Sequence, residues 1–156
     1  MCDITIIGIG NPDRGDDGAG WALIDAIQDL LPPCIVCRKS RGDISELLDL
    51  FSSSSTIYII DAILCDLKAG EILQLDENNL EDFDNKATST HALSLSRVIE
   101  MATLLEAMPK KLILYAISGK NYSLASNISF DVQNAISSLR DMLLKQKDIQ
   151  RCMNKA

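Results

Sequence analysis

Apolar segments alternate with amphipathic ones along this chain of 156 residues. The short apolar segments are typical of buried strands, and they cover residues 3–9, 34–39, 56–60, 71–75 and 111–117. The segments with apolar residues at helical spacing predict helices, and they cover residues 16–31, 92–107 and 129–147, with a short helix that starts at Asp43. This alternation indicates an α/β fold with three layers, a twisted, mostly parallel sheet of about five strands between helices.

Local signals set some of the expected boundaries. Trp21, Ile24, Ile27 and Leu31 recur at helical spacing, and Pro32-Pro33 stops that helix. Asp43 and Glu46 have the spacing of a capping box, in which each side chain bonds the other residue's backbone amide. Residues 76–89 are acidic and aperiodic, which predicts a loop. Without a linker or a repeat, we expect one domain over residues 1–156.

Composition narrows the class of protein. The net charge of −7 makes nucleic acid a poor partner, because an acidic surface repels phosphates. No apolar run is long enough to span a membrane, and no secretory leader is evident, so we expect a cytoplasmic protein. Nothing suggests an extended apolar interface, so we expect a monomer. The odd count of five cysteines indicates reduced thiols, with Cys34 and Cys37 as ordinary core residues.

The segment from Gly8 to Gly20 has the pattern of a strand, a glycine loop and a helix start. A nucleotide-binding loop would look similar, but the third fingerprint glycine is out of register and the P-loop Lys-Ser/Thr pair is missing. Asp13, Asp16 and Asp17 would repel a phosphate and attract a cation. Alternatively, Asp16 and Asp17 cap the helix and favour its dipole.

Two further residues have the chemistry of metal ligands. Asp61 follows a buried strand, where a carboxylate is costly unless it is paired, metal-bound or used in a turn. His91 is the only histidine and lies where a helix is expected to begin, in a structural role or as a ligand. Together with Asp17 they offer two carboxylates and one imidazole, which suits a divalent transition metal with open coordination positions. A Cys/His hydrolase would need Cys65 beside His91, and no pattern places them together.

In this order, the motifs resemble the hydrogenase maturation proteases, which trim the C-terminus of the nickel-iron hydrogenase large subunit. The matching segments are Gly8 to Gly20, Ile59 to Ala62 (Ile-Ile-Asp-Ala), Thr90 to Leu93 (Thr-His-Ala-Leu) and Met108 to Leu114 (Met-Pro-Lys-Lys-Leu-Ile-Leu). The resemblance implies a twisted sheet between helices and nickel contacts at Asp17, Asp61 and His91. Family members often have Glu at the first of these positions. They also often have Asp-Gly-Gly-Thr where this chain has Lys39 to Asp43, a difference that bears on substrate choice.

The resemblance implies an aspartyl-type endopeptidase that acts on the precursor of the hydrogenase large subunit. Its nickel would be supplied by the substrate precursor, and Asp17, Asp61 and His91 would test for that nickel. Asp17 or Asp61 would serve as general base, which fits the lack of a Gly-x-Ser-x-Gly nucleophile motif. The alternative is a non-enzymatic nickel-binding factor in hydrogenase maturation.

Overall fold

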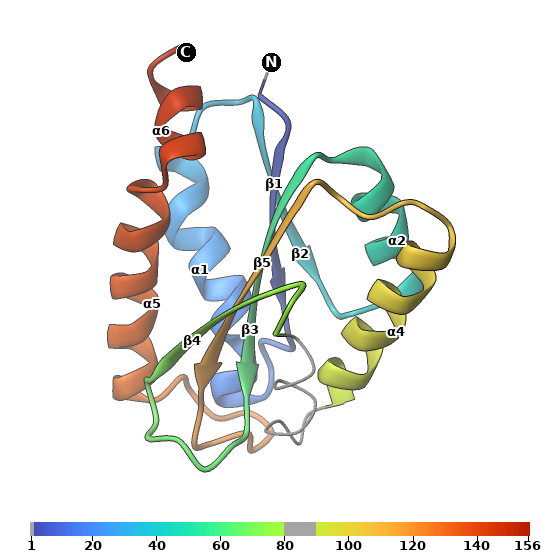
Figure 1. Ribbon diagram of the computed structural model, residues 1–156. Coiled ribbons are helices and arrows are strands. Elements are labelled where there is room, and N and C mark those ends of the chain that lie inside the picture. The colour runs from blue at the N-terminus through green and yellow to red at the C-terminus, as the bar shows by residue number, and fades with distance from the viewer. Residues whose placement is uncertain (1, 80–89) are drawn as a thin grey trace.

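The structure of the protein, a computed structural model, describes residues 2–79 and 90–156, with residues 90–94 described by their backbone alone. Its centre is a five-stranded sheet in the order β2-β1-β3-β5-β4. The strands are β1 (Ile4–Ile9), β2 (Ile35–Ser40), β3 (Thr56–Ile63), β4 (Ile72–Asp76) and β5 (Lys111–Ser118). The expected α/β class and mostly parallel sheet are confirmed (Figure 1).

Strand β4 is the one strand of this sheet that runs against its neighbour. It begins shortly after β3 ends, and parallel strands need a crossover of about a dozen residues or more. The chain therefore turns back and adds β4 antiparallel to the outer edge of β5, with Leu73 opposite Ala116. The other four strands are parallel, so their carboxyl ends form one edge of the sheet.

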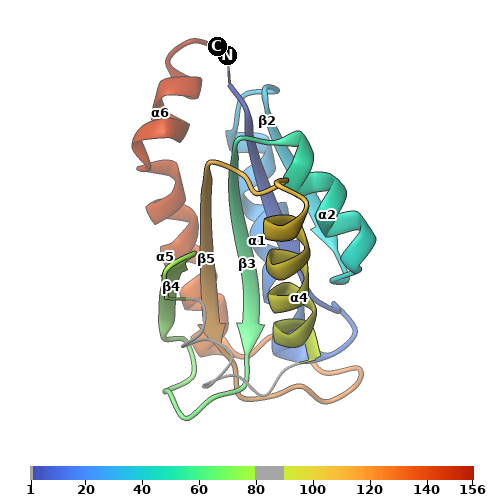
Figure 2. The same ribbon diagram turned by 45° about the vertical axis from the view of Figure 1, so that its right-hand side comes forward.

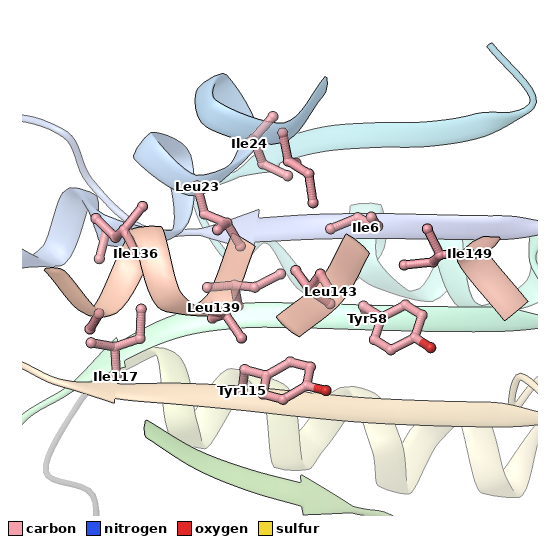
Figure 3. Close-up of a cluster of buried hydrophobic side chains, with 14 of the residues drawn as sticks. Ile6, Leu23, Ile24, Tyr58, Tyr115, Ile117, Ile136, Leu139, Leu143 and Ile149 are labelled. Carbon is pink, nitrogen blue, oxygen red and sulfur yellow. The ribbon is translucent and has the colours of Figure 1, made fainter. Parts of the chain in front are cut away.

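Helices cover both faces of the sheet (Figures 1 and 2). One layer consists of α1 (Ala19–Ile27), α5 (Phe130–Leu144) and α6 (Lys147–Met153), and the other of α2 (Ile44–Ser53) and α4 (Thr90–Leu104). Alternate strand residues fill the two cores, so Ile6 and Tyr58 face α1 and α5 while Ile7 and Ile57 face α2 and α4. Figure 3 shows the first core, where the Tyr58 and Tyr115 rings stack 6.4 Å apart.

The predicted elements are all present, but some boundaries differ. The first helix begins and ends as 3₁₀ turns, η1 (Gly15–Gly18) and η2 (Gln28–Leu30). Strand β3 continues through Asp61 to Ile63, because β5 extends beside it to Ser118. The closing helix divides into α5 and α6, since Gln146 is extended. The predicted loop 76–89 is described only to residue 79.

The capping box is half confirmed. The Glu46 amide donates to Asp43 Oδ1 at 3.1 Å, as the spacing predicted. The Glu46 carboxylate does not complete the box with the Asp43 amide. Instead it accepts a 2.8 Å hydrogen bond from the Ser40 hydroxyl, which ties α2 to the carboxyl end of β2.

The expectation that all five cysteines are reduced was wrong for Cys2 and Cys152. A disulfide joins Cys2 to Cys152, with their Cα atoms 5.8 Å apart. The two ends of the chain meet at one end of the molecule, which brings these distant residues together (Figure 2). The expectation that Cys34 is a core residue was also wrong, because this thiol is exposed, while Cys37 is half-buried. Among the described residues, no helix has the length and apolar character needed to cross a membrane.

Candidate functional site

Two glycines let the helix that carries the acidic pair pack directly on the sheet. A Cβ at Gly8 would lie 2.2 Å from the Gly20 carbonyl oxygen, and a Cβ at Gly20 would lie 2.5 Å from the Ile9 carbonyl oxygen and 2.7 Å from that of Ile60. Only glycine permits this approach of backbone to backbone. The first turn of α1 therefore lies across β1 and β3, and on β3 it contacts Ile60, the residue before Asp61.

Asp17 and Asp61 both lie at this carboxyl edge of the sheet. Asp17 is in η1 and only 8% exposed, and its Oδ2 accepts a 3.1 Å hydrogen bond from the Asn11 amide. Asp61 is 1% exposed and is held within β3 opposite Ala116 of β5. It is thus part of the strand and not of a turn after it. Two of the three predicted ligand residues therefore lie buried at the same edge of the sheet, and their binding of a cation stays a prediction.

Asp16 has a different role from its neighbour Asp17. Its buried carboxylate accepts hydrogen bonds from the amides of Lys120, Asn121 and Ser129, at 2.8, 3.0 and 2.6 Å, and from the Ser129 hydroxyl at 3.0 Å. Burial alone would raise the pKa of Asp16, but these hydrogen bonds outweigh it and hold the pKa below its usual value. Asp16 therefore anchors the loop after β5, and its side chain does not cap η1.

That loop adds a residue that the sequence reasoning missed. The Tyr122 hydroxyl is buried beside Gly119 and donates no hydrogen bond to a residue that the structure describes. Burial raises the pKa of Tyr122 and the charges of Asp61, Asp16 and Asp17 raise it further, while the nearby Gly119 amide lowers it by less. The phenol thus lies in the field of all three carboxylates and stays protonated as a donor. Its position after the carboxyl end of β5 was the available signal, because ligands bind at that edge of such sheets.

The third predicted ligand is placed by its backbone alone. His91 is in the first turn of α4, as the sequence indicated, and its side chain lies outside the described residues. Figures 1 and 2 show that α4 begins at the same end of the molecule as the carboxyl ends of β3 and β5. The structure therefore brings Asp17 and Asp61 to one edge and starts the helix of His91 there.

The described contacts of Cys65 do not include a base that would activate its thiol as a nucleophile. Its thiol is half-buried and donates to the Ser118 hydroxyl at a sulfur–oxygen distance of 3.6 Å. That hydroxyl in turn donates to the Leu67 carbonyl oxygen at 3.0 Å. These bonds fasten the start of the β3–β4 connection to the end of β5.

The segment that departs from the usual family pattern carries positive charge beside this edge. Lys39 Nζ and Arg41 Cζ lie 5.6 and 5.5 Å from the centre of the Trp21 ring, within the range of cation–π contacts. Trp21 donates from its indole to the Ser40 carbonyl oxygen at 2.9 Å, and Lys39 pairs with Asp25 at 2.6 Å. The end of β2 therefore presents a basic and aromatic surface.

Comparisons with known proteins agree with this architecture. A protein-family model described as hydrogenase maturation protease matches residues 42–146. No curated protein sequence matches the chain. The structure is similar to the hydrogenase maturating endopeptidase HybD from Escherichia coli, with a TM-score of 0.82 and 21% identity over 91% of this chain and 90% of that one.

Two further solved structures have the same fold. The [NiFe] hydrogenase maturation protease HybD from Thermococcus kodakarensis gives a TM-score of 0.78 and 24% identity over 92% of this chain and 97% of that one. The endopeptidase HycI from Escherichia coli gives a TM-score of 0.70 and 19% identity over 94% of this chain and 93% of that one. At these identities the structural matches establish the fold, while the family-model match establishes the family.

Proposed function

Because the chain belongs to the hydrogenase maturation protease family, we propose that it removes the C-terminal extension of a nickel-loaded [NiFe]-hydrogenase large-subunit precursor. As a family member it is a peptidase of hydrogenase maturation. The proposed action on a nickel-loaded precursor is supported by the placement of two buried carboxylates, Asp17 and Asp61, at the edge of the sheet where the helix of His91 begins.

Nickel enters this proposal as part of the substrate. Two carboxylates and one imidazole form an incomplete set of ligands for a divalent transition metal. Cysteine thiolates of the precursor would supply the remaining ligands, so a precursor without nickel would leave the site without its recognition element. The donor set of this chain fits that task, since it contributes oxygen and nitrogen ligands and leaves coordination positions open.

The residues at this edge support hydrolysis without a nucleophilic side chain. A metal ion polarises a carbonyl or activates water when it is bound near the scissile peptide. Asp17 and Asp61 bind and orient the precursor's metal-bearing segment, and one of the two carboxylates takes the proton from the attacking water. Tyr122 donates a hydrogen bond from its phenol to the oxyanion that forms on the scissile carbonyl, because this O–H donates to no described residue.

The decisive experiment compares nickel-loaded and nickel-free precursors as substrates of the purified protein. We expect cleavage of the nickel-loaded form only, with loss of activity in Asp61→Asn and His91→Ala. Asp13→Asn removes an exposed carboxylate from the same loop and is expected to cleave normally. Asp17→Glu, which restores the acid common in the family, should cleave while Asp17→Asn does not. Cleavage of both precursors, or nickel binding without cleavage of either, would overturn the proposal, and the second result would favour the non-enzymatic nickel-binding factor.

A further inference from the structure

Three cysteine sulfurs converge at the end of the molecule opposite the acidic edge. The Sγ atoms of Cys2, Cys34 and Cys152 all lie within 4.8 Å of one another. The fold brings them together, because Cys2 and Cys34 precede the paired strands β1 and β2, where Ile4 lies opposite Ile35. Helix α6 then places Cys152 against the same strand ends.

We propose that these three cysteines, once the Cys2–Cys152 disulfide is reduced, form a three-thiolate site for a thiophilic cation of the Zn²⁺ class. Thiolates are the ligands that such cations select. A zinc–sulfur distance of about 2.3 Å places the sulfurs of a tetrahedral site about 3.8 Å apart. The Cys34 sulfur would move by up to about 1 Å toward the other two, and the Cys2 and Cys152 sulfurs, once reduced, would move apart by about 1.7 Å.

The surroundings supply access, space and charge. Cys34 is exposed, so a cation can reach the sulfurs from solvent. A cavity of about 290 Å³ lies against Cys2 and Cys152 and has room for water as a fourth ligand. Arg151 and Lys155 line it and place positive charge beside the sulfurs of Cys2 and Cys152. Two carboxylates also line this cavity, Asp3 and Asp148, and the second is held by Lys111 at 2.8 Å.

The site and the disulfide exclude each other. Two equivalents of a small-molecule thiol reduce the Cys2–Cys152 bond, which yields two cysteine thiols and one oxidised disulfide of the reductant. Binding of the cation then displaces three protons, one from each cysteine. Either state links the two ends of the chain, through a covalent bond in one case and through a metal in the other.

The test uses the full chain, reduced and freed of reductant under anaerobic conditions, with Co²⁺ as a spectroscopic probe. We expect one equivalent of Co²⁺ to give a thiolate-to-cobalt charge-transfer band that Zn²⁺ abolishes. Cys34→Ser keeps the disulfide pair and so folds before reduction. It should lower the band by about one third and weaken Co²⁺ binding at least tenfold. Cys37→Ser is the matched control from the same segment, and its titration should equal that of the wild type.

Three results would overturn the proposal: no thiolate band, an equal band in Cys34→Ser, or an equal band in the oxidised protein. Asp61→Asn should leave the band unchanged, since this carboxylate belongs to the opposite edge of the sheet. The readout does not involve peptide cleavage, so its failure and the failure of the proposed protease function are distinguishable.

Discussion

Replacement of Asp16 by Asn should destabilise the protein strongly while its shape is retained. The Oδ2 atom accepts from the amides of Lys120 and Asn121 and from the Ser129 hydroxyl, and Oδ1 accepts from the Ser129 amide. The Asn side chain can accept with one oxygen only, and its NH2 group then faces a buried amide donor. An unsatisfied buried donor costs about 1–3 kcal/mol. Each of the other hydrogen bonds weakens by about 0.5–1 kcal/mol, because a neutral amide oxygen replaces a charged carboxylate oxygen as the acceptor.

Together these losses predict a decrease of about 4 kcal/mol in the free energy of unfolding, measured by urea denaturation at neutral pH. For a chain of this size that corresponds to a fall of roughly 8–16 °C in Tm. Asp13→Asn is the control, since its exposed side chain should change stability by less than about 0.5 kcal/mol. A loss below about 1 kcal/mol in Asp16→Asn would refute the assignment of Asp16 as the anchor of the loop.

The pH dependence gives an independent check on the same residue. The pKa of Asp16 is lowered in the folded state, so its contribution is fully present above the unfolded-state pKa and is lost as the pH falls through the folded-state value. The stability difference between wild type and Asp16→Asn should therefore be constant from about pH 5 to 8 and shrink below about pH 4. A difference that does not change with pH would contradict the role of the ionised carboxylate.

Three more substitutions test the site and the fold. Tyr122→Phe should slow precursor cleavage by about 10²-fold, with unchanged urea stability, and a normal rate would exclude the proposed oxyanion contact. Gly20→Ala places a Cβ 2.5 Å from the Ile9 carbonyl oxygen, so it should cost about 1–3 kcal/mol and abolish cleavage, and neutral behaviour would contradict the packing. Cys2→Ser removes a disulfide between residues 150 positions apart, so without reductant its free energy of unfolding should be up to about 5 kcal/mol lower than that of the wild type. Equal stability would mean that no disulfide forms.

The strands were predictable because their signal is local. An apolar run such as Ile4–Ile9 can be recognised without knowing which strands lie beside it. The parallel orientation of the strands follows from the helices that connect them. The end of β3 was not predictable in this way, because its last residues are fixed by pairing with Ser118 and Ile117 of a strand more than 50 positions later. The break between α5 and α6 has the same origin, since Ile149 and Cys152 pack on the far end of the sheet.

The candidate site was predictable only in part for a related reason. Asp17 and Asp61 carry a chemical signal where they stand, at a glycine loop and near the end of an apolar run. The resemblance separated Asp17 from Asp16, which was expected to cap the helix, and only the contacts of Asp16 with residues 120–129 show that it anchors a loop instead. Tyr122 had no motif of its own, and its relevance comes from the field of carboxylates that are distant in the sequence.

The burial of Asp17 and Asp61 also bears on why such a site would respond to a metal-bearing substrate. A cation beside two carboxylates that are withdrawn from water is attracted more strongly than a neutral peptide, because the low local dielectric strengthens the interaction. Strand β3 fixes the position of Asp61, and the Asn11 amide donates to Asp17, so both carboxylates are held at this edge. The fold thus keeps two acidic groups at the site. Under the proposed function the precursor would bring the positive charge to them, which is the property that a probe for nickel in another protein requires.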